Sequence, residues 1–350
     1  TLANLTSDGD YDLRIGYDIE SFYHFYVAEY GNHTIRKVTA DGVVTTLTTG
    51  ASFTGKYSLV VVNNNLYIAT DTGTLYKLVL STDIITNIAT GFNIPFGIAT
   101  DGTYIYVASF ACKVYQIKLD GDFPGGTNSR VFAGTGDSGS VDGVANSAKF
   151  ITPRNIICIG SNLYIPDGYP GNKIRKILIN SDGTAGNVST LVTVTATGYN
   201  YGGITNIGNT IYYGSASNIY KIIIDDNGNF ISSSLLLDTG GGTFSSSPVK
   251  PWSRLTNDGV NLYCTRDIDS HEIFKIPINS DGRAGTAVSF VGSITRWYAD
   301  GTGSAAQFNQ IGSVIPVATL PFTGKNNIAI GEKALFSNTI GEGNVAIGHK

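Results

Sequence analysis

The chain has 350 residues, of which 14% are charged, and its formal net charge at pH 7 is -4. Globular domains usually carry about 25% charged residues, and the Lys and Arg residues here are dispersed, so a basic patch for nucleic acid or an anionic membrane is excluded. No apolar run approaches the roughly 20 residues that span a bilayer. The 43 Gly and 20 Tyr residues favour a β-rich protein with many tight turns. Because Met is absent even at Thr1, we expect a processed product or a fragment.

One short pattern recurs in six copies along the chain. In each copy, a strand ending in Tyr-aliphatic-Ala is followed by a loop and then by aliphatic-(Arg/Tyr)-Lys-aliphatic. The clearest copy occupies residues 25–28, 35–38 and 44–47, and five looser copies are anchored at Tyr67, Tyr106, Tyr164, Tyr212 and Tyr263. A repeat of this length is one supersecondary unit that must stack on its neighbours to bury its faces.

Each copy is predicted to contain four strands, the Tyr-bearing strand being the second and a weaker strand, such as 189–192, the outermost. The innermost strands are expected at residues 15–18, 59–62, 97–100, 155–158, 203–206 and 254–257. The third strands, which carry the Lys, are expected at residues 35–38, 75–78, 114–117, 174–177, 219–222 and 273–276. Four short antiparallel strands recurring about every 40 to 60 residues predict an all-β fold, a six-bladed β-propeller of four-stranded antiparallel blades.

Two segments resemble a known repeat family. Residues 26–38 read Tyr-Val-Ala-Glu-Tyr-Gly-Asn-His-Thr-Ile-Arg-Lys-Val, and residues 131–136 read Val-Phe-Ala-Gly-Thr-Gly, followed by Asp142-Gly143 and by residues 148–150. Both closely resemble the NHL repeat, and the resemblance, over roughly residues 11–315, implies a propeller. Residues 300–315 echo residues 142–156, so this segment either completes the ring or carries the chain out of it.

The end of the chain has a different pattern. Residues 327–331 read Asn-Ile-Ala-Ile-Gly, and residues 344–348 read Asn-Val-Ala-Ile-Gly. This resembles the Ala-Ile-Gly head repeat of trimeric autotransporter adhesins, which also occurs in phage tail fibres. Alternating apolar residues give each short strand one apolar face, and two such turns bury too little surface to be stable alone. The resemblance implies a homotrimer, assembled through Ile328, Ile330, Leu335, Val345 and Ile347; the other interpretation is a β tail with coincidental similarity.

These patterns predict four regions. They are a lead-in or strand at residues 1–10, the NHL-type propeller at 11–296, an additional inner-strand-like segment and linker at 297–323, and the start of a trimeric fibre at 324–350.

The sequence shows no signature of an enzyme. Some NHL-type propellers are enzymes, as in the amidating lyases. A resemblance to those lyases would imply zinc held by several His in the central channel. No nucleophile elbow, P-loop or HExxH motif occurs. The histidines, none of them on a predicted inner strand, are His24, His33, His271 and His349. We therefore expect no catalysis, no metal and no cofactor.

Acidic turns, lysines and cysteines have ordinary interpretations. Residues 8–10 and 225–228 resemble calcium loops, but both lack the downstream Glu of an EF-hand, and Asp-Gly is common turn chemistry. The cysteines have neither the number nor the spacing of a disulfide framework or a zinc site, so Cys112, Cys158 and Cys264 are expected to be buried free thiols. One lysine per blade could form a ligand ring, but we favour side chains lying along a strand face for Lys37, Lys77, Lys176, Lys221 and Lys275.

Aromatic residues gather in the loops that join the second and third strands and in the connections between blades. In a four-stranded blade these loops share one face of the propeller. Aromatic rings among Asn, Ser and Gly suit sugar rings, whose C–H faces stack while hydroxyls form hydrogen bonds. Alternatively, the rings fill gaps between blades. The expected ligand-binding or receptor-binding residues are Tyr30, Phe110, Tyr169, Tyr199, Tyr201, Trp252, His271 and, less directly, Trp297.

The interpretation that fits both parts of the chain is a receptor-binding protein of a phage tail fibre, located in the virion. It would present the propeller on a homotrimeric fibre, bind a host-surface glycan or protein without chemistry, and contact other tail or fibre proteins. A bacterial cell-surface or secreted adhesin is the alternative. A glycan lyase or hydrolase is the third possibility, and it would need a carboxylate pair at glycosidase separation.

Overall fold

A computed structural model describes residues 23–29, 33–47, 57–168, 172–194, 202–215, 218–238, 255–265, 271–293, 295, 297–309, 311–318, 328–330 and 345–347. The chain divides into two compact units, His24–Ala318 and a second unit that contains Thr1–Tyr23 and Thr319–Lys350. The units are described separately. None of the described residues forms a helix long and apolar enough to cross a membrane.

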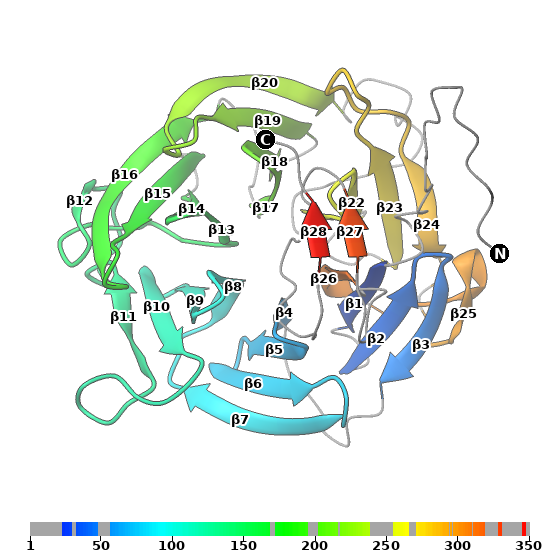
Figure 1. Ribbon diagram of the computed structural model, residues 1–350, viewed down its shortest axis with the longest axis horizontal. Helices are drawn as coiled ribbons and strands as arrows, with labels where there is room; N and C mark the ends of the chain where they lie inside the picture. The colour runs from blue at the N-terminus through cyan, green and yellow to red at the C-terminus, as the bar shows by residue number, and fades with distance from the viewer. Residues whose placement is uncertain are drawn as a thin grey trace. The chain divides into compact units, whose positions relative to one another are not determined.

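Six antiparallel sheets, within the described residues, surround the centre of the first unit like the blades of a propeller (Figure 1). Four of them contain consecutive strands: β4 (Tyr57–Val62), β5 (Asn65–Thr70), β6 (Thr74–Val79), β7 (Ile84–Thr90); β8 (Pro95–Thr100), β9 (Tyr104–Ser109), β10 (Lys113–Lys118), β11 (Ser129–Ala133); β17 (Gly203–Ile207), β18 (Thr210–Ser215), β19 (Asn218–Ile224), β20 (Phe230–Asp238); and β21 (Leu255–Asn257), β22 (Asn261–Thr265), β23 (Glu272–Pro277), β24 (Val288–Gly292). The predicted six-bladed propeller is confirmed.

The two remaining blades each have a fifth strand. The blades are numbered in chain order, so that the first contains β1. The fourth blade follows the order β12-β16-β15-β14-β13, with β12 (Gly143–Val144), β13 (Ile157–Ile159), β14 (Asn162–Asp167), β15 (Lys173–Ile179) and β16 (Ala185–Thr193). The first blade follows the order β25-β3-β2-β1-β26, with β1 (Tyr23–Glu29), β2 (Thr34–Thr39), β3 (Val43–Leu47), β25 (Gly301–Thr302) and β26 (Ile311–Ala318). A short 3-10 helix, Gly303–Ala305, lies between β25 and β26.

The ring is closed by pairing the two ends of the first unit. Strand β26 takes the innermost place beside β1, so the segment that echoes residues 142–156 completes the ring. We predicted residues 15–18 for the innermost strand of the first blade; they lie outside the described residues, and β26 holds that place beside β1. Because β25 pairs with the outer strand β3, one segment of chain borders the first blade on both edges.

The predicted Tyr-bearing strands form the core of each blade. Strands β14 and β22 are buried at every residue, because blades cover both of their faces. A buried Tyr usually has a hydrogen-bond partner for its hydroxyl. For two of these tyrosines the partner is an Asp in the turn before the second strand. Tyr106 Oη donates to Asp101 Oδ2 at 2.7 Å, and Tyr263 Oη donates to Asp258 Oδ2 at 2.8 Å.

Two buried arginines hold the five-stranded blades together. Arg175 Nη1 donates to Asp167 Oδ2 at 3.0 Å, and its Nη2 donates to Asp142 Oδ1 at 2.8 Å. Arg36 makes the equivalent ion pairs in the first blade, with Glu29 at 3.0 Å and Asp300 at 2.7 Å. Asp142 and Asp300 lie in the two segments whose sequences echo each other, so this echo reflects one structural role: docking the segment on a blade.

Side chains of the third strands connect neighbouring blades. Gln116 Nε2 donates to Gly183 O at 2.9 Å, in the turn between the third and fourth strands of the next blade. Lys221 Nζ makes the corresponding contact with Gly282 O at 3.4 Å. Lys176 Nζ likewise contacts Asn227 O at 3.2 Å. The sequence predicted that these lysines lie along a strand face. Lys176 and Lys221 also join their blade to the next one.

In the second unit, two short strands pair in parallel. They are β27 (Ile328–Ile330) and β28 (Val345–Ile347), with Ile328 opposite Val345 and Ile330 opposite Ile347. Parallel strands require a connection of about a dozen residues or more, and the segment between the two Ala-Ile-Gly copies is long enough for them to pair in this way. Leu335 lies outside the described residues, and the trimer stays a prediction.

Candidate binding surface and central channel

One partly exposed cluster lies on the predicted binding face, where the third and fourth blades meet. It contains Ile94, Phe96, Phe110 and Arg154 and is called the aromatic cluster below. The rings of Phe96 and Phe110 have centroids 6.0 Å apart, and the guanidinium carbon of Arg154 lies 5.1 Å from the Phe96 centroid. Phe110 is 46% exposed and Ile94 is 40% exposed, so the cluster offers apolar surface beside a cation.

The backbone positions this cluster through two local features. Phe110 N donates to Ile94 O at 3.1 Å, which ties the loop after β9 to the connection between the second and third blades. A Cβ on Gly97 would lie 2.5 Å from Asn155 Cα, so only glycine lets the blades come close enough to bring Arg154 to Phe96. Ile94 has a φ of 47°, which is unusual for a β-branched residue and typical of functional or over-constrained positions.

The structure places only some of the predicted binding residues. Phe110 belongs to the aromatic cluster, whereas His271, directly before β23 in the sixth blade, is half-buried. Because the third and sixth blades are opposite each other in the ring (Figure 1), the structure does not bring these two residues together. Trp297 is 67% exposed and its N donates to Phe308 O at 3.4 Å, in the segment that closes the ring. The predicted residues outside the described ranges are Tyr30, Tyr169, Tyr199, Tyr201 and Trp252.

Sequence reasoning missed three members of the aromatic cluster. Phe96 belongs to β8, and an aromatic residue within a strand is usually interpreted as part of the hydrophobic core. Ile94 and Arg154 lie in connections between blades and belong to no repeated motif. The alternation of apolar and polar residues could not reveal them, because their proximity depends on how two blades pack.

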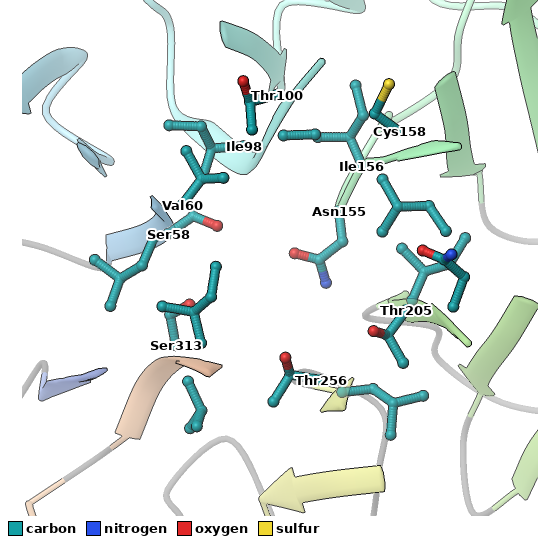
Figure 2. Close-up of a pocket in the computed structure, with 18 residues that line it drawn as sticks. Ser58, Val60, Ile98, Thr100, Asn155, Ile156, Cys158, Thr205, Thr256 and Ser313 are labelled. Atoms are coloured by element: carbon teal, nitrogen blue, oxygen red, sulfur yellow. The ribbon is translucent and has the colours of Figure 1, made fainter. Parts of the chain in front are cut away.

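The six inner strands surround a central channel. Its cavity has a volume of about 230 Å³ and is lined by residues of β4, β8, β13, β17, β21 and β26 and by Asn155 and Ile156. Figure 2 shows Ser58, Asn155, Thr205, Thr256 and Ser313 around the middle of the cavity. Each inner strand is the terminal strand of its sheet, so one of its backbone edges has no neighbouring strand.

The channel is lined by uncharged side chains. They include hydroxyls, amides and aliphatic groups such as those of Val60 and Ile98. Burial raises the pKa of the Cys158 thiol to about 12, with a smaller contribution from the negative charge of Asp101, so Cys158 is neutral at pH 7. Within the described ranges, no group of three or more His, Cys, Asp or Glu could hold a metal ion.

The predicted acidic turn at residues 225–228 forms hydrogen bonds within itself and to Asn229. Asp225 Oδ1 accepts from Asn229 N at 2.7 Å, and Asp225 Oδ2 accepts from Asn229 Nδ2 at 3.1 Å. The first of these bonds is the main cause of a lowered pKa at Asp225. The other predicted turn, at residues 8–10, lies outside the described residues.

Comparisons with known proteins match the fold. No protein family model matches the sequence, and no curated protein does. A nidogen/laminin complex contains a chain with a TM-score of 0.57 and 14% identity, covering 85% of this chain and 99% of that chain. An auxiliary nutrient binding protein from Bacteroides thetaiotaomicron VPI-5482 has a TM-score of 0.55 and 14% identity, covering 84% of this chain and 71% of that chain.

An enzyme candidate is among the similar structures. A candidate 6-phosphogluconolactonase from Bacteroides uniformis ATCC 8492 has a TM-score of 0.50 and 17% identity, covering 79% of this chain and 84% of that chain. Identities this low show the fold alone. The chain is thus a six-bladed β-propeller similar to propellers of binding proteins and of candidate lactonases.

Proposed function

We propose that this chain is a receptor-binding protein of a phage tail fibre, which presents its propeller on a homotrimeric fibre and binds a host-surface glycan without chemistry. The observation that carries the proposal is the aromatic cluster, in which the exposed Phe110 ring and the half-buried Phe96 ring lie beside an arginine on the predicted binding face. Loops that carry recognition residues on a rigid scaffold are the usual arrangement for binding proteins.

The chemistry of the cluster favours a glycan with an anionic group. Phe110 offers a ring edge and face for the C–H groups of a sugar, and such stacking adds roughly 1 kcal/mol beyond burial. The positive charge of Arg154, whose guanidinium carbon lies 5.1 Å from the Phe96 ring centroid, favours an anionic group such as a carboxylate or phosphate nearby. Bacterial surface polysaccharides commonly carry both kinds of group, which makes them a suitable ligand class.

A fibre would compensate for the weakness of one such site. The parallel pairing of β27 with β28 is what a stacked Ala-Ile-Gly repeat requires, and the resemblance of that repeat implies three chains. Three linked sites can raise effective affinity by about 10² or more when they engage together. The alternative function, a bacterial cell-surface or secreted adhesin, would use the same surface. A glycan lyase or hydrolase on this scaffold is the third possibility.

The test compares two phenylalanines of similar exposure. Phe110 is 46% exposed in the aromatic cluster, and Phe230 is 42% exposed on the outer strand β20 of the fifth blade. For Phe110→Ala we expect about fivefold weaker binding per site, and about 100-fold weaker binding by a fibre that engages three sites. Phe230→Ala should bind as the wild type does, and both variants should keep the wild-type melting temperature within about 2 °C.

The assay is binding of the protein, with its complete repeat region, to an array of bacterial surface glycans and to host cells. Equal binding by Phe110→Ala and wild type would place recognition elsewhere. Loss of binding by both variants would indicate a general surface effect. A wild-type protein that binds cells but no glycan on the array would favour a protein receptor.

A further inference from the structure

The central channel is lined by hydroxyl groups that have no hydrogen-bond partner among the described residues. Ser58 and Ser313 are each only 6% exposed, and both line the channel (Figure 2). Among the described residues, the hydroxyls of Ser58, Ser313 and Thr256, which also lines the channel, form no hydrogen bond with another residue. None of these three hydroxyl oxygens is among the fully buried side-chain atoms without a partner, so they are accessible from the cavity. They can form their hydrogen bonds with water or with a ligand in it.

The surrounding backbone adds further hydrogen-bonding capacity. Each inner strand has one edge without a neighbouring strand, and this edge presents backbone N–H and C=O groups. The channel therefore offers donors and acceptors from several directions. A ligand with hydroxyl groups matches this arrangement because each hydroxyl both donates and accepts.

Charge and size narrow the ligand class. The lining carries no charged side chain, and an ion in such a cavity would lose its hydration without gaining a counter-charge. Apolar groups of Val60 and Ile98 lie between the polar ones and suit the C–H groups of a carbohydrate. The cavity of about 230 Å³ is below the roughly 300–1,000 Å³ of sites for drug-sized ligands, so a small ligand is expected.

We propose that the central channel is a binding site for one neutral polyhydroxylated molecule of monosaccharide size, held by the hydroxyls of Ser58, Thr256 and Ser313 and by the inner strand edges. The lining of this site shares no residue with the aromatic cluster, so the proposal goes beyond receptor binding and does not rest on it. Because such small polar ligands gain little free energy per atom, the expected dissociation constant is roughly millimolar.

The probes are free neutral sugars and their charged analogues. Ligand-observed NMR with the full chain would test glucose, galactose, N-acetylglucosamine and myo-inositol against glucosamine and glucuronate. We expect at least one neutral compound to bind and both charged compounds to bind at least tenfold more weakly. If no neutral compound binds at about 50 mM, or if the charged analogues bind equally well, the proposal is wrong.

Variants then locate the site. Thr256→Val keeps the shape of the side chain and removes its hydroxyl, and Ser58→Ala removes a second one. The double variant should weaken sugar binding about tenfold or more, given the usual contribution of a hydrogen bond. Thr45→Val, on the exposed face of β3, is the matched control and should bind as the wild type does. The melting temperature checks folding, and unchanged sugar binding in a folded double variant would overturn the assignment.

Discussion

Replacing Arg175 with Met is expected to destabilise the propeller strongly. The side chains of Arg175 and Asp167 are both fully buried and lie 3.0 Å apart. Removing one partner of a buried ion pair costs about 3–5 kcal/mol, because the other charge stays buried without compensation. The pair with Asp142 adds little, since that carboxylate is half exposed and screened by solvent. We therefore expect a loss of about 4 kcal/mol and a melting temperature lower by about 10 °C.

The assay is urea and thermal unfolding of wild type and Arg175→Met, followed by circular dichroism. The control is Arg283→Met, because Arg283 is 85% exposed and lies 3.8 Å from Asp281, a pair expected to contribute no measurable stability. A loss of less than about 1 kcal/mol in Arg175→Met, or an equal loss in the control, would refute the reasoning.

A second variant distinguishes a buried charge from lost packing. Asp167 Oδ1 accepts backbone N–H groups of Ile151 and Thr152, both at 2.9 Å. Asn at this position can keep that acceptor oxygen while removing the charge. The double variant Arg175→Met with Asp167→Asn should therefore be more stable than Arg175→Met alone. If it is less stable, the cost comes from packing around the guanidinium.

The same pair predicts a pH dependence. Burial raises the pKa of Asp167, against the opposing hydrogen bond from Thr152 and the charge of Arg175. A carboxyl with a raised pKa in the folded state binds its proton more tightly there than in the unfolded chain, so stability falls as pH rises above about 3.9. Without Arg175 the pKa rises further and the fall is steeper. The destabilisation by Arg175→Met should be smaller at pH 4 than at pH 7.

Two further predictions concern a turn and the end of the chain. Gly73→Ala should lower stability by about 2 kcal/mol in urea unfolding, because Gly73 has a φ of 88° and a Cβ there would lie 2.2 Å from Phe92 O. Gly91→Ala, at a φ of 91° with open space around the Cβ, should cost less, and equal losses would contradict the steric argument. Removing residues 322–350 should leave a folded monomer in sedimentation experiments while the protein with its complete repeat region sediments as a trimer; a monomeric complete protein would refute trimerisation.

The sequence by itself determined most of the strands, their order within a blade and the number of blades, but not the innermost strand of the first blade or the fifth strands β12 and β25. Alternation and the Tyr and Lys positions are local signals, because side chains of a strand alternate between faces every two residues. The predicted segments 75–78 and 219–222, for example, lie within β6 and β19. The echo between residues 142–156 and 300–315 also indicated a second docked segment, although it left the ring closure open.

Only the tertiary structure decided which distant residues meet. Pairing of β26 with β1, contact of Arg154 with Phe96, and convergence of Ser58 and Ser313 on one channel all join residues from different parts of the chain. No local pattern encodes these contacts, since each depends on how blades pack and on where the ring closes. The physical reason is that strand periodicity is fixed by neighbouring residues, whereas a binding surface or a channel exists only after separate blades have been brought together.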